Sequence, residues 1–264
     1  MTIHHPAPGI LRGVLWDLFG TLIRPERAGG SDLAPDTSDT FEAINTAHLV
    51  HWAAAQGLPT PPETAAVIRE ARRWMWAQTY ATGRQFLTRE ALARAGADLG
   101  WPQDPIFFEE ASRVFFAAEV DMVKPFREAA ATLAALREMG LRQAVVSNAS
   151  EHHLVTRAVE RTGLREFFDP VISSAGFGRI KPDAAIFRAV LDAWGLPAEQ
   201  CAMVGDSLEA DIAGAQAVGL RAILVTMDPN PANALVADRI RPDAVAASLA
   251  EVVPIIRRWM EPPD

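Results

Sequence analysis

Cysteine is almost absent from this 264-residue chain, in which Cys201 is the only one. A single thiol excludes an intrachain disulfide and a metal cluster held by several cysteines. Cys201 stands in the apolar run Gln200-Cys-Ala-Met-Val, so we expect a buried strand thiol rather than a nucleophile. Lysine is almost as scarce, because Lys124 and Lys181 are the only two in an arginine-rich sequence.

The chain also lacks an excess of positive charge and any long hydrophobic run. Its formal net charge is −8, which opposes attraction to nucleic acid or to an anionic membrane, so we expect neither partner. No 18-residue apolar run is present, and the first residues, Met1-Thr-Ile-His-His, lack the basic and apolar regions of a signal peptide. We therefore expect a cytoplasmic location.

The composition and the pattern of short apolar runs indicate an α/β protein. Hydrophobic residues make up 49 % and charged residues 22 %, which is ordinary for a globular chain with a substantial core. Short apolar runs that end in a polar turn predict five buried strands. These runs, with their polar endings, cover residues 10–17, 143–148, 170–173, 201–206 and 222–226.

Helical periodicity alternates with these strands at residues 127–139, 151–161, 183–194, 208–218 and 248–260. Such alternation predicts a doubly wound parallel sheet of the Rossmann type. The alternation breaks between the first two strands, where helical patterns occur at residues 40–56, 62–79, 88–99 and 104–119. We therefore predict a core domain of residues 1–23 and 123–264 and an inserted helical domain of residues 24–122, entered through Arg24-Pro-Glu-Arg-Ala-Gly-Gly.

Three carboxylates follow predicted strands and are candidate metal ligands. Asp17 ends the first strand, and Asp206 ends the fourth, with Asp211 a short distance along the chain. The carboxyl ends of parallel strands share one edge of a sheet, so Asp17 and Asp206 should meet. Asp206 by itself is explained equally well as a helix cap, but its coincidence with Asp17 is not. Because neighbouring carboxylates repel, we expect a hard, oxygen-preferring cation such as Mg²⁺ between them.

Other polar residues at the strand ends suit an anionic substrate. Lys181 lies just before Pro182, at the start of a predicted helix, where a cation can hold substrate oxygens. Ser147 and Asn148 follow the second core strand and offer a hydroxyl and amides to an anion, although an ordinary turn explains them as well. Asp17 is followed by a Gly-Thr turn that lets backbone amides approach an anion closely.

Taken in this order and in this strand context, the segments around Asp17, Ser147, Lys181 and Asp206 resemble the haloacid dehalogenase superfamily of hydrolases. The helical insertion resembles the cap of the first subfamily, often called a C1 cap. The resemblance implies that Asp17 is the nucleophile and Lys181 stabilises charge. It also implies that Thr21, Ser147, Asn148 and Lys181 contact the phosphate of a small-molecule substrate, and that Asp17, the Phe19 carbonyl, Asp206 and Asp211 hold Mg²⁺.

Phe19 departs from the pattern of the phosphatases in this superfamily. Most of them carry a second Asp two residues after the nucleophile, and that Asp protonates the leaving group. Phe19 moves no proton, whereas the 2-haloacid dehalogenase branch places an aromatic residue here and releases halide without protonation. That branch works without metal and usually has Ser-x-Asn in place of Gly205-Asp206, which this chain retains.

Three functional hypotheses remain open from the sequence. The leading one is a Mg²⁺-dependent phosphatase that forms an aspartyl-phosphate, and the second is a metal-independent 2-haloacid dehalogenase. The third is a ligand-binding homologue with little or no catalysis. Trp74, Met75 and Trp76 either pack the core of the helical insertion or shape a pocket over the site, since helical caps close on the ligand.

Overall fold

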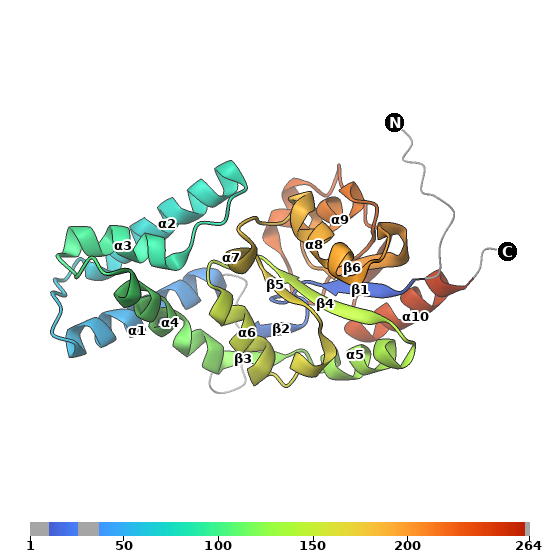
Figure 1. Ribbon diagram of the computed structural model, residues 1–264, viewed down its shortest axis with the longest axis horizontal. Coiled ribbons are helices and arrows are strands. Elements are labelled where there is room, and N and C mark those ends of the chain that lie inside the picture. The colour runs from blue at the N-terminus through green and yellow to red at the C-terminus, as the bar shows by residue number, and fades with distance from the viewer. Residues whose placement is uncertain (1–10, 26–36, 262–264) are drawn as a thin grey trace.

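The computed structural model describes residues 11–25 and 37–261, with side chains described from residue 41 in the second range. Most of the predicted entry linker, Arg24–Gly30, therefore lies outside the described residues, as does Ile10 of the first predicted strand. Two groups of elements lie along the long axis of the molecule (Figure 1): helices α1 to α4 are at one end and the main sheet is at the other.

The main sheet has six strands, all parallel, in the order β5-β4-β1-β6-β7-β8. They are β1 (Gly13–Trp16), β4 (Arg142–Ser147), β5 (Val171–Ser173), β6 (Cys201–Gly205), β7 (Arg221–Val225) and β8 (Ala244–Ala246). β1 is central because the chain builds outward on one side through β4 and β5 and on the other through β6, β7 and β8. The carboxyl ends of β1, β4 and β6 are thus side by side.

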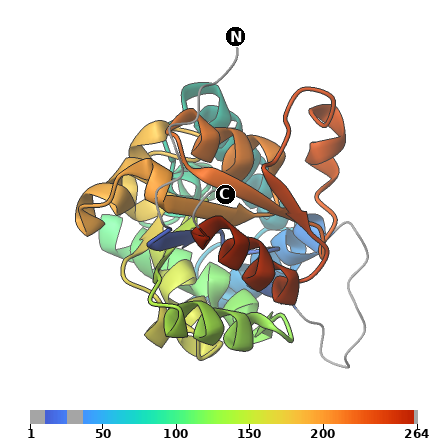
Figure 2. The same cartoon turned by 90° about the vertical axis from the view of Figure 1, so that its right-hand side faces the viewer.

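Helices cover both faces of the sheet because its inner strands are apolar on both sides. The helices of this part are α5 (Ala129–Glu138), α6 (His152–Arg161), α7 (Ser174–Phe177), α8 (Ala184–Trp194), α9 (Gly214–Ala217) and α10 (Leu249–Met260). Helices α5, α6 and α10 pack on the face that carries Val14 and Trp16, and α8 and α9 on the face that carries Leu15. Figure 2 shows α10, in red, lying along its face of the sheet.

Cys201 of β6 is buried in the core beneath α8, as the sequence predicts. Burial raises the pKa of its thiol to about 12. The thiol therefore stays protonated and unreactive at neutral pH, which agrees with a packing role rather than a nucleophilic one.

Four helices form the insertion between β1 and β4: α1 (Thr37–Ala55), α2 (Thr64–Thr82), α3 (Thr88–Leu99) and α4 (Pro105–Met122). They share an apolar core that includes Leu49, Met75, Leu92 and Phe115. At the base of the insertion β2 (Ile23–Pro25) pairs antiparallel with β3 (Val123–Pro125). The two chain segments that connect the insertion to the sheet part therefore lie side by side. They are close to the predicted domain boundaries, which remain predictions.

The predicted fold class is confirmed, and most helices begin and end within a few residues of their predicted positions. The predicted strand count was wrong, because β8 adds a sixth strand and β2 and β3 form a small second sheet. β8 is only Ala-Val-Ala at a sheet edge, too short and too alanine-rich for a clear strand pattern. The single helix predicted at residues 208–218 is a π-helix, Leu208–Ala213, followed by α9.

Short 3₁₀ segments, Arg165–Phe167, Ala198–Gln200 and Pro231–Leu235, complete the described elements. Within residues 11–25 and 37–261, none of the helices has the length and apolar character that crossing a membrane requires.

Candidate active site

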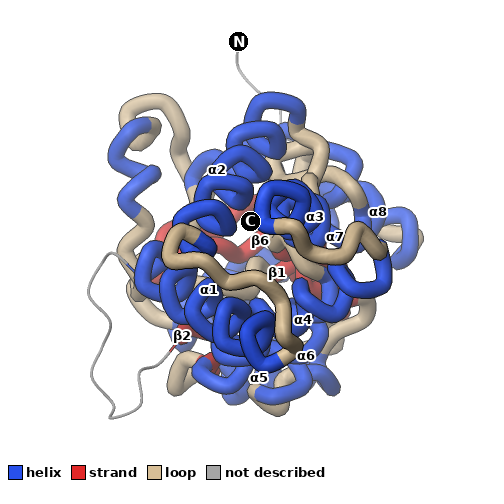
Figure 3. The backbone as a smooth tube through the Cα atoms, turned by 90° about the vertical axis from the view of Figure 1, so that its left-hand side faces the viewer, coloured by secondary structure: helices blue, strands red, loops and turns tan. Residues whose placement is uncertain are grey.

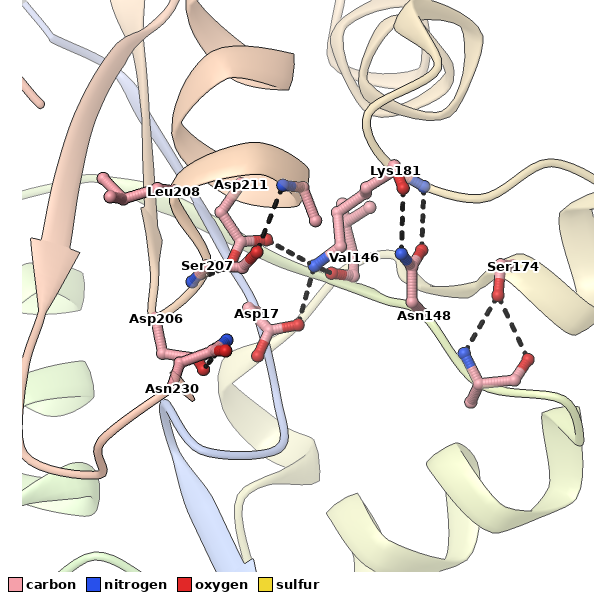
Figure 4. Close-up of polar contacts among 12 residues, drawn as sticks. Asp17, Val146, Asn148, Ser174, Lys181, Asp206, Ser207, Leu208, Asp211 and Asn230 are labelled. Carbon is pink, nitrogen blue, oxygen red and sulfur yellow. Dashed lines mark hydrogen bonds and ion pairs between the residues drawn. The ribbon is translucent and has the colours of Figure 1, made fainter. Parts of the chain in front are cut away.

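Three carboxylates converge at the carboxyl edge of the main sheet (Figure 4). Asp17 directly follows β1, Asp206 directly follows β6, and Asp211 lies in the π-helix that comes next. One oxygen of each lies within 4.8 Å of the others, and this is a group that can hold a metal ion. The predicted meeting of Asp17 with Asp206 is therefore found, and Asp211 joins them.

Lys181 lies among these acids and is almost completely buried, with 2 % of its surface exposed. Its Nζ contacts Asp17 Oδ1 at 2.6 Å and Asp211 Oδ1 at 2.7 Å, and it donates to the Val146 carbonyl at 2.6 Å. The ammonium group thus donates to Asp17 and to the end of β4, and it forms an ion pair with Asp211. The contact with Lys181 holds Asp17 Oδ1 in place, and the other carboxylate oxygen of Asp17 takes no part in it.

Backbone shape around the site depends on two glycines. A Cβ at Gly205 would overlap the Asp211 carboxylate, so only glycine lets that side chain lie against the end of β6. Gly20 has a φ of 80° and lies against Asp206, where a Cβ would be 3.2 Å from Asp206 Cγ. The Ser207 amide donates to Asp211 Oδ2 at 2.9 Å, which further fixes the orientation of that carboxylate.

Asn148 holds the backbone that carries Lys181. Its Nδ2 donates to the Lys181 carbonyl at 3.0 Å, and its Oδ1 accepts from the Lys181 amide at 2.8 Å. These paired bonds join the end of β4 to the loop before α8. Ser147, at the end of β4, is buried and lines the same cavity as Asp17.

Thr21 is the one predicted substrate contact that the structure does not bring to this cavity. It is fully buried, and the residues that line the cavity around Asp17 do not include it. Among the described residues, its hydroxyl is a buried polar atom without a hydrogen-bond partner.

Two asparagines that the sequence reasoning missed support Asp206. Asn230 Nδ2 donates to Asp206 Oδ2 at 2.9 Å, and Asn233 Nδ2 donates to the Asp206 carbonyl at 2.8 Å. Both come from the segment after β7, where no motif marks them. The strand order could have found them, since β7 is adjacent to β6 and its carboxyl end faces the same edge.

Burial and mutual repulsion shift the ionisation of the acids. Burial raises the pKa of Asp17 to about 6, with Lys181 opposing the rise and Asp211 adding to it. Burial, together with the charges of Asp17 and Asp211, raises the pKa of Asp206 to about 8. Burial disfavours the charged form of Lys181, but its two acid neighbours outweigh this and raise its pKa above the usual value. Burial is thus the largest cause of the rise at both aspartates, and the neighbouring carboxylates add to it.

A cavity of about 930 Å³ opens over the Asp17 carboxylate. Its walls come from all the strand ends of the site and from the end of α2. The lining includes Asp17, Phe19, Tyr80, Ser147, Asn148, Lys181, Asp206 and Asp211. Phe19 reaches both this cavity and the apolar cores of the sheet part and of the helical insertion.

A family model described as a haloacid dehalogenase-like hydrolase matches residues 11–219, which include Asp17, Lys181, Asp206 and Asp211. The chain belongs to the haloacid dehalogenase-like hydrolase family. The family confirms the predicted enzyme class, a hydrolase.

Curated relatives of this hydrolase include phosphatases. Phosphoserine phosphatase of Thermus thermophilus is 31 % identical over 205 residues, covering 74 % of this chain and 78 % of that protein. Haloacid dehalogenase-like hydrolase domain-containing protein 3 of Bos taurus is 37 % identical over 128 residues, covering 48 % of this chain and 50 % of that protein. Ribulose-1,5-bisphosphate 5-phosphatase of Halopiger xanaduensis is 35 % identical over 129 residues, covering 49 % of this chain and 52 % of that protein. The chain thus spans about half the length of these last two relatives.

Solved structures of similar fold include both dehalogenases and phosphatases. The 2-haloacid dehalogenase of Pseudomonas syringae superimposes with a TM-score of 0.70 at 27 % identity, over 95 % of this chain and 100 % of that one. A phosphatase of the same superfamily from Thermococcus onnurineus gives a TM-score of 0.59 at 19 % identity, over 93 % of this chain and 98 % of that one. The likeness to the Thermococcus onnurineus phosphatase shows a shared fold only.

Proposed function

We propose that this hydrolase is a Mg²⁺-dependent phosphatase that acts on a small phosphorylated metabolite through an aspartyl-phosphate at Asp17. The observation that carries the proposal is the charge of the buried cluster. Asp17, Asp206 and Asp211 lie within 4.8 Å of one another, and Lys181 is the one lysine or arginine that contacts them in the described structure. Ionising all three acids beside a single ammonium group leaves a buried excess of negative charge, which is costly, and a divalent cation offsets that cost.

The donor set fits Mg²⁺, because it consists of carboxylate oxygens that can be joined by a backbone carbonyl. Asp17, Asp206, Asp211 and the carbonyl of Phe19 are the residues that would hold the ion. When bound, Mg²⁺ supplies positive charge that neutralises phosphoryl oxygens and lowers the cost of charge built up in the transition state.

Asp17 is the proposed nucleophile. A pKa of about 6 leaves its carboxylate largely ionised at neutral pH. Its oxygen attacks phosphorus, and the bond from phosphorus to the leaving oxygen breaks with its electron pair on that oxygen. Water then attacks phosphorus and loses a proton to solvent, and the phosphorus-to-Asp17 bond breaks, which returns the carboxylate and releases phosphate.

Lys181 offsets the charge on Asp17 and on the phosphoryl group in this scheme. Asn148 is better described as a positioning residue, because both ends of its side chain are bonded to the Lys181 backbone. Ser147 provides the hydroxyl contact to phosphate, and Thr21 is retained as a predicted contact from the family pattern. We also propose that residues 24–122 act as the cap domain over the core domain of residues 1–23 and 123–264.

A 2-haloacid dehalogenase is the second candidate, and Phe19 favours it. No proton donor stands two residues after Asp17, and the Pseudomonas syringae structure of similar fold is named as such a dehalogenase. In this scheme Asp17 attacks carbon and halide leaves with the electron pair, so no leaving-group proton and no metal are needed. The cluster of three carboxylates, which suits a metal ion, weighs against it.

The proposal is tested by phosphate release from a panel of phosphate esters that includes p-nitrophenyl phosphate, with Mg²⁺ and with EDTA. We expect Mg²⁺-dependent release, reduced at least about 10³-fold in Asp17→Asn, as for removal of other nucleophiles. Asp206→Asn should remove the stimulation by Mg²⁺, whereas Asp192→Asn, a matched change at an exposed position of α8, should keep it. Halide release from 2-haloacids that persists in EDTA would instead establish the dehalogenase. A cytoplasmic location remains part of this proposal.

A further inference from the structure

A second cavity of about 660 Å³ adjoins the cavity over Asp17. The two share Phe19, Tyr80, Asn148 and Asp206 as lining residues. The second cavity extends away from the sheet edge between the core and helices α1, α2 and α4, which face the viewer in Figure 3. If phosphate binds at Asp17, the rest of the substrate lies here, so a substrate-binding role for this cavity rests on the proposed function.

Among the described residues that line this second cavity, Arg72 is the one lysine or arginine, and its charge is already balanced. Its Nε donates to both carboxylate oxygens of Glu42, at 2.7 and 2.9 Å, and its Nη1 donates to Thr88 at 2.6 Å. The guanidinium also lies over the Phe115 ring, 4.4 Å from its centroid. With 5 % of its surface exposed, Arg72 serves the packing of the helical insertion rather than an incoming carboxylate.

Glu119 provides a second carboxylate in this cavity, and no lysine or arginine of the described residues forms an ion pair with it. Asn45 Nδ2 donates to Glu119 Oε2 at 2.7 Å, which is a neutral contact. Asn45 itself is 1 % exposed, and among the described residues its Oδ1 is a buried atom without a hydrogen-bond partner. The end of the cavity formed by α1 and α4 therefore offers hydrogen-bond acceptors and negative charge.

Aromatic rings make up much of the remaining wall. The lining includes Phe19, Phe41, Trp76, Tyr80 and Phe116. Trp76 and Tyr80 stack at 5.6 Å between ring centroids. Aromatic faces attract cations, above all organic ammonium groups, and they also accept the apolar body that carries such a group. Rings beside a carboxylate form a site for an ammonium ion rather than for an anion.

We infer that the second cavity binds a positively charged amino group on the leaving-group side of the substrate, with Glu119 as its counter-ion. The substrates favoured are thus small phosphate esters of amino alcohols, and esters that carry a carboxylate at the same place are disfavoured. Glu119 and Asn45 receive the hydrogens of the ammonium group, and the rings of Trp76 and Phe116 pack against its carbon atoms.

The experiment compares three esters of similar size: phosphoethanolamine, 2-hydroxyethyl phosphate and phosphoglycolate, which are cationic, neutral and anionic beyond the phosphate. We expect kcat/KM for phosphoethanolamine to exceed that for the neutral ester by about tenfold, the usual strength of a cation over aromatic rings. Glu119→Gln should remove this preference mainly through KM and leave turnover of 2-hydroxyethyl phosphate within about twofold. Glu110→Gln, an exposed glutamate of the same helix, should keep the preference.

Binding of ethanolamine, followed by calorimetry, supplies a readout that does not depend on turnover. We expect wild type and Glu110→Gln to bind ethanolamine and Glu119→Gln to bind it about tenfold more weakly. Asp17-dependent hydrolysis with a preference for phosphoglycolate would overturn the inference and leave the phosphatase intact. Absence of all ester hydrolysis would overturn the phosphatase. The ethanolamine titration would then test the cavity by itself, and lack of binding would rule out the ammonium site.

Discussion

Phe19 decides which leaving groups the proposed reaction accepts, because it lines the cavity two residues after Asp17, where the phosphatase pattern predicts a proton donor. An aromatic ring can neither protonate a leaving oxygen nor activate water. The enzyme as it stands should therefore favour esters whose leaving group is stable without a proton. A nitrophenyl ester is such a substrate, whereas alkyl esters, those of amino alcohols included, should turn over more slowly.

Phe19→Asp should restore the missing donor. We expect kcat for an unactivated alkyl phosphate to rise by at least about tenfold, since general acid–base catalysis contributes about 10² to 10⁴ in rate. The gain for p-nitrophenyl phosphate should be smaller, because its leaving group needs no proton. Phe19→Asn serves as the control for loss of the ring. Equal activity of the Asp and Asn variants on the alkyl ester would contradict this role for position 19.

The acids of the site should make stability depend on pH when metal is removed. The pKa values of Asp17 and Asp206 rise to about 6 and about 8 in the folded state, from 3.8 in the unfolded chain. The folded protein therefore binds more protons than the unfolded one in this window. The stability that these groups contribute is full below about pH 4 and is lost as the pH rises toward 8.

This dependence can be measured as the change in Tm in EDTA between about pH 5 and pH 8, the window that the two raised pKa values define. We expect Tm to fall with rising pH and Asp206→Asn to flatten the slope, because an amide at that position does not titrate. Asp192→Asn should keep the wild-type slope. Identical slopes for wild type and Asp206→Asn would show that Asp206 does not carry the shift.

Sequence reasoning located Asp17, Lys181, Asp206 and Asp211 because strand ends and motif order constrain them. It did not find Arg72 or Glu119, since helical periodicity places many polar residues on the surface of a helix and marks none of them. Their meeting depends on how α1, α2 and α4 pack together, which is a tertiary property. Asn230 was missed for the same reason, because the loop after β7 has no distinctive pattern.

At the scale of elements, the loop between α7 and α8 inserts Lys181 between β1 and the π-helix. Asn148 of the β4 end fixes the backbone of this loop through paired hydrogen bonds. The loop thus joins the ends of β1 and β4 to the π-helix that follows β6. We expect most of the stability that this loop contributes to come from the buried ammonium group of Lys181.

Lys181→Met should lower the free energy of unfolding by about 3–5 kcal/mol, the usual cost of breaking a buried ion pair by removing one member. The double variant Asp17→Asn with Lys181→Met should lose less than the sum of the two single losses, because it removes both charges of one contact. Urea unfolding of the four proteins measures this coupling. Strict additivity would mean that the 2.6 Å contact contributes no stability.

Helix positions were predictable at this scale because caps and periodicity mark them, as in α3, whose observed bounds match the prediction. The strands β2, β3 and β8 were not, because each has only three residues and gains its form from the neighbour it pairs with. The π-helix after β6 was also missed. It carries Asp211 against Gly205, an arrangement set by that close approach and not by local propensity.

At the scale of the whole molecule, the reactive edge of the sheet and the helical insertion share the two adjoining cavities. The phosphate chemistry is proposed for the sheet side, and the choice of leaving group for the helical side. The parallel sheet was predictable from alternating strands and helices, and so was the insertion from the break in that alternation. The substrate was not, because it depends on side chains that meet only when the two parts pack together.

The central claim is that Asp17 attacks phosphorus rather than carbon, and isotope transfer from water tests it most directly. The wild-type enzyme turns over p-nitrophenyl phosphate many times in ¹⁸O-water with Mg²⁺, and phosphate and the peptide containing Asp17 are then analysed by mass spectrometry. We expect ¹⁸O in the released phosphate and none in Asp17, because water attacks phosphorus and the carboxylate keeps its oxygens. Lack of phosphate release, with halide release from 2-chloropropionate and ¹⁸O in Asp17, would contradict the claim.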